Sequence, residues 1–444
     1  MLENSAPAEN SMMISQDIQF PSYSQSVNLS RFPASFYFDF DNDNKKDLIV
    51  APNGNNISHN YENIWFYKNE SSTNEVILNL SNRAALIDQM IDVGSGAHPV
   101  FFDHNNDGLM DLIIANYGYY LDGGNFNSQL ALYENIGDIN NPHFKWITND
   151  YCNLGGYNFL NNISPTFGDL DNDGDQDMLI GDENGELHFL VNIPSNNESY
   201  FYPSSINYFD IDVGSFASPF LIDLDRDTDL DLIIGTRQGQ IYFYENQGSP
   251  SEANFVLSSD QLGNINLTDP VYNTAYTTPI VIDGNNGYEL YIGSEKGQIH
   301  HYINLENDIY GNYEEAIDSM TLYSNGIRTT LAIYDLNNDG WMDMLTGVYT
   351  GGLHLLWGCD STYMNVKENI IKNIKIYPNP TEGIIYIDDP EKLLKIDLYN
   401  IEGKLCSSYK ATNKLNFSNL EQGIYIMKLT TKFNQIIFNK IVIQ

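Results

Sequence analysis

One acidic motif recurs six times between Asp39 and Gly347 and constrains the fold more than any other feature of the chain. Its first Asp returns at steps of 64, 66, 54, 60 and 52 residues. An apolar run precedes the motif, and a Gly turn with an alternating segment follows it, as in GELHFLVN (185–192). Each unit therefore predicts a strand, an acidic loop, a strand, a Gly turn, a strand and room for a fourth strand. The six copies are DFDNDNKKDLIVA (39–51), DHNNDGLMDLIIA (103–115), DLDNDGDQDMLIG (169–181), DLDRDTDLDLIIG (223–235), DGNNGYELYIG (283–293) and DLNNDGWMDMLTG (335–347).

Repetition of three or four strands per unit predicts an all-β chain with a β-propeller as its main domain. A two-sheet sandwich is the alternative, but it does not explain why the same loop returns once per unit. Residues 371–444 carry a net charge of +3 and the remainder −41, which indicates a domain boundary. We expect a disordered N-terminus (1–16), the propeller (17–358), a polar linker (359–373) and a small C-terminal antiparallel β-sandwich (374–444).

The pattern D-x-[DN]-x-D-G-x-x-D places oxygen ligands where a tightly curled loop brings them together. Positions 1, 3 and 5 converge on a centre, the Gly allows the sharp turn, position 7 offers its carbonyl and position 9 closes the shell. Such a set of six or seven oxygens suits Ca²⁺, whereas Mg²⁺ needs a tighter octahedron and softer metals need His or Cys. An EF-hand is excluded because it closes with Glu at position 12 and has flanking helices.

The alternative is a set of acidic surface turns, since Asp, Asn and Gly favour turns. Six aligned copies of mutually repelling carboxylates favour a cation instead. Loop five is two residues shorter and keeps only Asp283 and Glu289, so we expect no calcium there. About five structural Ca²⁺ sites are predicted, with affinities of roughly 10⁻⁴–10⁻³ M. Their candidate ligands are Asp39, Asp41, Asp43, Asp47, Asp103, Asn105, Asp107, Asp111, Asp169, Asp171, Asp173, Asp177, Asp223, Asp225, Asp227, Asp231, Asp335, Asn337, Asp339 and Asp343.

These loops and their flanks resemble the FG-GAP and VCBS repeat family, which includes the blade loops of integrin α chains. The resemblance covers roughly residues 17–358 and implies a seven- or eight-bladed propeller with calcium on its loops. Six units fall short of that number. Residues 17–38 could supply an outer strand that closes the last blade, or upstream blades could be missing. Residues 1–20 have no basic segment followed by an apolar one, so no signal peptide is recognised, and we expect a truncated N-terminus.

The C-terminal segment contains YPNPTEG (377–383), LYNIEGK (398–404) and LEQGIYIMKL (420–429), followed by a Lys-containing last strand. These blocks resemble the type A sorting domain of the Bacteroidota type IX secretion system. The resemblance implies that residues 374–444 interact with the secretion machinery and that the protein passes through the periplasm to the medium or the outer-membrane surface. A domain that binds carbohydrate or caps the propeller is the alternative.

Other features of the sequence argue against several classes of function. The net charge of −38 makes nucleic acid an improbable partner, and no run of about 18 apolar residues predicts a membrane span. His188, His300 and His354 share one repeat position, which repetition explains without a common zinc or catalytic role. His104, at position 2 of loop two, is expected to point outward. No known catalytic motif appears, so an enzyme is not favoured.

We therefore expect a monomeric, calcium-stabilised binding or adhesion module with a polysaccharide or protein ligand on the propeller face. The alternative is a calcium-dependent polysaccharide-active enzyme, such as a lyase, on the same scaffold.

Overall fold

The computed structural model divides the chain into two compact units, Met1–Gly358 and Cys359–Gln444. The predicted linker lies almost wholly outside the described residues. In the described part of the chain, no helix is long and apolar enough to cross a membrane. The structure describes all residues except 1, 5–12, 30–32, 55–58, 73–75, 89, 122–123, 158–160, 285–286, 317–323, 325, 360–374, 389, 401–403, 421 and 432–435.

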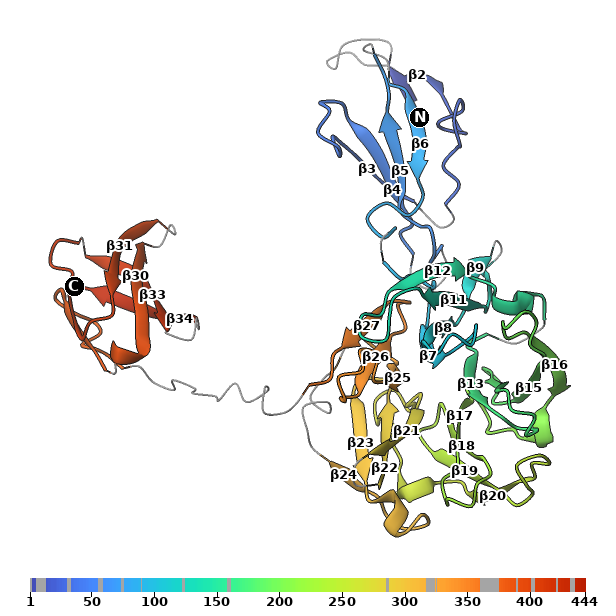
Figure 1. Cartoon of the computed structure of the whole chain (residues 1–444). Helices are drawn as coiled ribbons and strands as arrows, with labels where there is room; N and C mark the ends of the chain where they lie inside the picture. Colours follow the sequence, from blue (N-terminus) through green and yellow to red (C-terminus); the bar gives the residue numbers. More distant parts are fainter. Residues whose placement is uncertain are drawn as a thin grey trace. The chain divides into compact units, whose positions relative to one another are not determined.

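Each of the six sequence repeats forms one antiparallel sheet, as the repeat pattern predicts (Figure 1). Four strands build each of the first five sheets, and three described strands build the sixth. The first sheet contains β3 (Ala34–Phe38), β4 (Asp47–Ala51), β5 (Trp65–Asn69) and β6 (Leu78–Asn82), and the second contains β7 (His98–Phe102), β8 (Asp111–Ala115), β11 (Leu130–Asn135) and β12 (Phe144–Thr148). The third contains β13 (Ser164–Gly168), β14 (Asp177–Gly181), β15 (Leu187–Asn192) and β16 (Phe201–Ile206), and the fourth β17 (Ser218–Ile222), β18 (Asp231–Gly235), β19 (Ile241–Asn246) and β20 (Phe255–Ser259). The fifth contains β21 (Thr278–Gly284), β22 (Gly287–Gly293), β23 (Ile299–Ile303) and β24 (Glu314–Ala316), and the sixth β25 (Thr330–Tyr334), β26 (Asp343–Gly347) and β27 (Leu353–Leu356).

Smaller elements complete the first unit. A hairpin, β9 (Tyr119–Leu121) with β10 (Asn125–Asn127), follows β8, and short 3₁₀ helices lie at Tyr151–Gly156, Tyr208–Asp210, Leu262–Asn264 and Leu305–Asn307. The expectation of a disordered residue range 1–16 needs correction for its described part. There β1 (Leu2–Asn4) and β2 (Met13–Gln16) pair as antiparallel strands, because each segment supplies backbone hydrogen-bond partners for the other.

The second strand is the most deeply buried strand in four of the repeats, and all five residues of β8, β14, β18 and β26 are buried. These strands are apolar on both faces because another sheet packs on each side. One cluster joins Leu179 and Leu187 of the third sheet to Leu221 and Leu232 of the fourth. Full burial of such a side chain contributes about 1.5–3 kcal/mol, so the main core lies between adjacent sheets.

Five of the six sheets close into a ring around a common axis (Figure 1). Their inner strands, β7, β13, β17, β21 and β25, contact one another in cyclic order, and β25 contacts β7 to close the cycle. A channel of about 260 Å³ is lined by residues of all five. The Oγ1 hydroxyl of Thr330, in the sixth repeat, donates to the carbonyl of Ala97, in the second, at 2.7 Å.

The first sheet lies outside this cycle, because its strands make no comparable contact with the inner strands among the described residues. The cycle thus differs from the seven or eight blades that the family resemblance implies. Two features of each repeat bring adjacent sheets of the ring together. They are the residue at the end of the second strand, which is glycine in four repeats, and the turn that follows it.

Gly181, Gly235, Gly293 and Gly347 each face a backbone carbonyl of the next sheet in the ring. A Cβ at Gly235 would lie 2.2 Å from the Thr277 carbonyl oxygen, and one at Gly347 would lie 2.3 Å from that of Ala97. At these four positions the final glycine permits a close approach between sheets, whereas the second repeat has Ala115 at the equivalent position.

A cyclic set of backbone hydrogen bonds, which we name the axial belt, joins the five sheets at the end opposite the acidic loops. It uses the turn after each second strand and the residue two or three positions before each inner strand. In each repeat, the backbone N–H of the turn residue donates to a carbonyl in the segment before the inner strand of the same repeat. The carbonyl of that turn residue accepts from a backbone N–H in the segment before the inner strand of the next repeat. These bonds are 2.6–3.3 Å long. The belt residues are Tyr117, Glu183, Arg237, Glu295 and Tyr349 on the turns and Gly96, Asn162, Phe216, Tyr276 and Arg328 before the inner strands.

The second unit is a small antiparallel sandwich. One sheet has the order β28 (Ile376–Tyr377), β29 (Ile384–Ile387), β32 (Lys414–Asn416), and the other the order β31 (Leu405–Lys410), β30 (Leu393–Asn400), β33 (Gly423–Thr431), β34 (Ile436–Ile443). A 3₁₀ helix, Pro390–Lys392, precedes β30. Ile385 and Leu415 from the first sheet pack with Ile396, Leu398 and Met427 from the second. The unit thus has a core of its own.

Candidate metal centre

The Asp at position 9 anchors each full-length acidic loop. In loop three the carboxylate of Asp177 accepts the backbone N–H of Leu170 at 3.2 Å and that of Asn192 at 2.9 Å. The first bond holds the start of the loop, and the second ties the loop to the third strand. The equivalent residues in the other full-length loops, Asp47, Asp111, Asp231 and Asp343, make the same pair of bonds and are almost completely buried.

The carboxylate of the first Asp stabilises the curled backbone of the loop by accepting hydrogen bonds from backbone amides. In loop four the amides of Asp227 and Thr228 each donate to the carboxylate of Asp223, at 3.0 Å. Position 4 is left-handed, as in Arg226 with φ 62°, and so is position 6, as in Thr228 with φ 86°. A β-branched residue is strained at such an angle, and loop four carries Thr228 where the motif has glycine.

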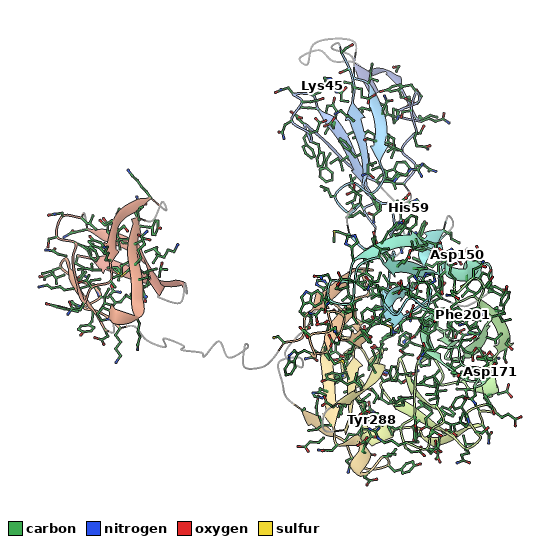
Figure 2. All side chains as sticks on the ribbon, viewed as in Figure 1. Lys45, His59, Asp150, Asp171, Phe201 and Tyr288 are labelled. Carbon is green, nitrogen blue, oxygen red and sulfur yellow. The ribbon has the colours of Figure 1, made fainter. Side chains whose placement is uncertain are left out.

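Three loops bring candidate ligands together. Carboxylate oxygens of Asp169, Asp171 and Asp177 lie within 4.8 Å of one another, and Figure 2 labels Asp171. The groups Asp39–Asp41–Asp43 and Asp223–Asp225–Asp231 meet the same limit. In loops two and six the amides of Asn105 and Asn337 donate to Asp107 and Asp339 at 3.0–3.1 Å, so these loops assemble fewer acids.

Unpaired carboxylate oxygens support a cation in loops three and four. The Oδ1 atoms of Asp169, Asp175 and Asp229 are buried and have no hydrogen-bond partner in the described structure. Burial raises the pKa of Asp229 to about 6, with the charge of Asp227 adding to the effect. Asp175 and Asp229 occupy position 7, to which the sequence analysis assigned only a backbone carbonyl. The signal was in the sequence, because only loops three and four have Asp at that position.

Loop five has another arrangement. β21 and β22 continue into a hairpin instead of a curled loop. The Arg226 guanidinium, from loop four, bonds Asp283 Oδ1 at 2.9 Å and Oδ2 at 3.3 Å and lies 4.1 Å from the ring centre of Tyr288. Glu289 accepts from the Tyr291 hydroxyl at 3.1 Å and lies 3.0 Å from His301 Nε2. A protein cation therefore stands beside the acids of this repeat.

The three aligned histidines do not converge. His188, on β15, lies 3.0 Å from Asp182 of its own repeat, and His300, on β23, lies 2.8 Å from Glu315 of its own repeat. His354 is exposed on β27. The expectation for His104 was wrong: its side chain is buried and its ring contacts that of Tyr151, because position 2 faces the core, where Leu170 and Leu224 occupy the equivalent sites.

The stabilisation of the fold by calcium should increase as pH rises. Burial raises the pKa of Asp177 to about 6 and that of Asp231 to about 7, above the value of about 3.9 in an unfolded chain. Ionisation of these groups therefore destabilises the metal-free fold as pH rises from about 4 to about 7, whereas a bound divalent cation favours their ionised forms. We expect calcium to raise the melting temperature more at about pH 8 than at about pH 5. Equal shifts at the two pH values would contradict this account.

Comparison with known proteins identifies both parts of the chain. Residues 39–114 and 103–180 match the family described as FG-GAP-like repeat, and residues 375–444 match the secretion system C-terminal sorting domain. An ulvan lyase of Nonlabens ulvanivorans is 27% identical over 92 residues, which cover 20% of this chain and 17% of that protein.

Two solved structures are similar at low identity. The extracellular domain of a putative hybrid two component system from B. thetaiotaomicron has a TM-score of 0.30 and 11% identity, over 90% of this chain and 48% of that one. An α-L-arabinofuranosidase from Clostridium thermocellum has a TM-score of 0.36 and 11% identity, over 72% of this chain and 95% of that one. The sorting domain indicates export by type IX secretion and a secreted or cell-surface location. The chain thus contains FG-GAP-like repeats in its first unit and a type IX secretion C-terminal sorting domain in its second.

Proposed function

We propose that the propeller is a calcium-stabilised binding or adhesion module that acts outside the cell. The observation that carries the calcium proposal is the set of buried, unpartnered carboxylate oxygens in loops three and four. Oxygen donors from several carboxylates in one tight loop suit a hard cation of the size and charge of Ca²⁺. Bound calcium would hold the curl and fasten the first hairpin of a sheet, which leaves the rest of the propeller surface available for a ligand.

Calcium titration of paired variants tests the metal proposal. Asp171→Ala removes a carboxylate from the loop-three cluster, whereas Asp283→Ala removes an exposed acid already paired with Arg226. We expect chelation to lower the melting temperature of the wild-type protein by roughly 5 °C, as for loss of any ligand that binds only the native state. The decrease in melting temperature on chelation should be smaller in Asp171→Ala than in the wild type and should be unchanged in Asp283→Ala. Equal loss in the two variants would refute the assignment of the sites.

A second candidate is a calcium-dependent lyase that acts on an acidic polysaccharide. The relative named an ulvan lyase favours it only weakly, because the match spans one fifth of this chain. Incubation with acidic polysaccharides at millimolar calcium separates the two functions. Retention of intact polymer supports a binding module, whereas release of products with an unsaturated sugar end establishes the lyase.

A further inference from the structure

Side chains of the axial belt form a polar cavity at one mouth of the ring. All five belt residues before the inner strands have positive φ, from 46° at Tyr276 to 66° at Gly96. Gly96 and Asn162 tolerate this conformation, but Phe216, Tyr276 and Arg328 each carry a cost on the order of 1 kcal/mol. The fold therefore retains large side chains at the axis where a glycine would relieve strain.

Two arginines stand at this mouth. The Arg328 guanidinium lies 3.8 Å from the ring centre of Tyr276 and 4.6 Å from that of Tyr349, and its Nε donates to Glu295 at 3.3 Å. The Arg237 guanidinium lies 5.6 Å from the same Tyr276 ring. Stacking and the ion pair hold Arg328 in place, so the cation is positioned before any ligand arrives.

In the described part of the chain, Arg237 forms no ion pair. Residues 1–370 contain 11 basic and 52 acidic residues, and two other cations of the ring form ion pairs, Arg226 with Asp283 and Lys296 with Asp269. Among the described residues, no acidic side chain lies within ion-pair distance of Arg237. Burial raises the pKa of Glu183, and the positive charges of nearby Arg237 and Arg328 act against that rise.

The space between these groups is a cavity of about 260 Å³. Arg237, Arg328, Tyr349 and Asn162 line it together with other belt side chains, among them one acid, Glu183. Its donors are two guanidinium groups, tyrosine hydroxyls and a carboxamide. A guanidinium matches a carboxylate with two parallel hydrogen bonds, and the neutral donors match hydroxyl groups.

We propose that the axial cavity binds the carboxylate group of an acidic sugar, with Arg237 as its main ionic partner; the proposal rests on the binding function proposed above. A peptide carboxylate fits less well, because extended peptides are recognised through free backbone groups and the belt amides and carbonyls already bond one another. The surrounding hydroxyl and amide groups would then bond the sugar hydroxyls.

Calorimetric titration of the full chain with short galacturonate oligosaccharides in calcium tests the assignment. Arg237→Gln should weaken binding by about tenfold or more, because a charge-assisted hydrogen bond is lost. Lys145→Gln is the matched control, since it removes an exposed cation of β12 outside the belt, and its affinity should equal that of the wild type. Methyl-esterified oligosaccharides keep the sugar and lose the charge, so the wild-type protein should bind them about as weakly as Arg237→Gln binds the free acids.

Each other outcome overturns the inference. Equal affinity of the wild type, Arg237→Gln and Lys145→Gln would place the sugar elsewhere and leave the binding module standing. Wild-type binding to neutral glycans alone would do the same. Arg237-dependent binding of oligoglutamate with no binding of galacturonate would assign the cavity to peptides, whereas failure to bind any glycan or protein tested would remove the proposed function itself.

Discussion

Gly235→Ala is expected to destabilise the ring by about 3 kcal/mol and to lower its melting temperature by roughly 5–10 °C. The new Cβ would lie 2.2 Å from the Thr277 carbonyl oxygen and 2.5 Å from Pro279 Cδ. Both atoms belong to the rigid start of the next inner strand, so relief requires movement of the two sheets rather than of a flexible side chain. Thermal unfolding with bound calcium held constant measures the effect.

Gly352→Ala is the control for this prediction. A Cβ at Gly352 meets nothing within 4 Å, and the backbone there is not left-handed. Its melting temperature should stay within about 2 °C of the wild type. Similar losses in both variants would mean that close packing between sheets does not limit stability.

Removal of residues 374–444 is expected to abolish export while leaving the first unit folded. The two units have separate cores, and Met1–Gly358 closes its ring without any residue of the second. In a Bacteroidota host, with a signal peptide supplied, the truncated chain should accumulate in the periplasm and keep the wild-type circular dichroism. The intact chain should reach the surface or the medium.

A core variant of the sorting domain sharpens this test. Leu398→Asp places a carboxylate in the fully buried centre of the sandwich and should block export as the truncation does. Leu394→Asp, on the same strand but exposed, should be exported normally. Export of the truncated chain at the wild-type level would contradict a sorting role for residues 374–444.

The strand order within each repeat and the curled acidic loops could be predicted, because both depend on contacts between residues close in sequence. The pattern D-x-[DN]-x-D-G determines the local turns, and alternation of apolar residues determines which strands pair. The number of sheets in the ring could not be predicted, because it depends on which distant edges meet. Gly347 faces Ala97 of the second repeat, and nothing in the motif of the first repeat signals its exclusion.

The first repeat does differ in its inner-strand position. Phe36, Tyr37 and Phe38 are 56%, 47% and 45% exposed, whereas the equivalent strands of the ring are mostly buried. From the sequence, an apolar aromatic strand is predicted to be buried. The structure shows that no neighbouring sheet covers this one, because the ring closes without it. The arrangement of the arginines at the axis was missed for a related reason, because Arg328 stacks on Tyr276 of the preceding repeat.

The closure of the ring between the sixth and second repeats also has a consequence for assembly of the chain. The bond from Thr330 to Ala97 joins residues 233 positions apart, so the seam of the ring forms only after nearly all of the ring sequence has been synthesised. Closure of the ring therefore depends on contacts between its two ends, which are the contacts most distant in sequence.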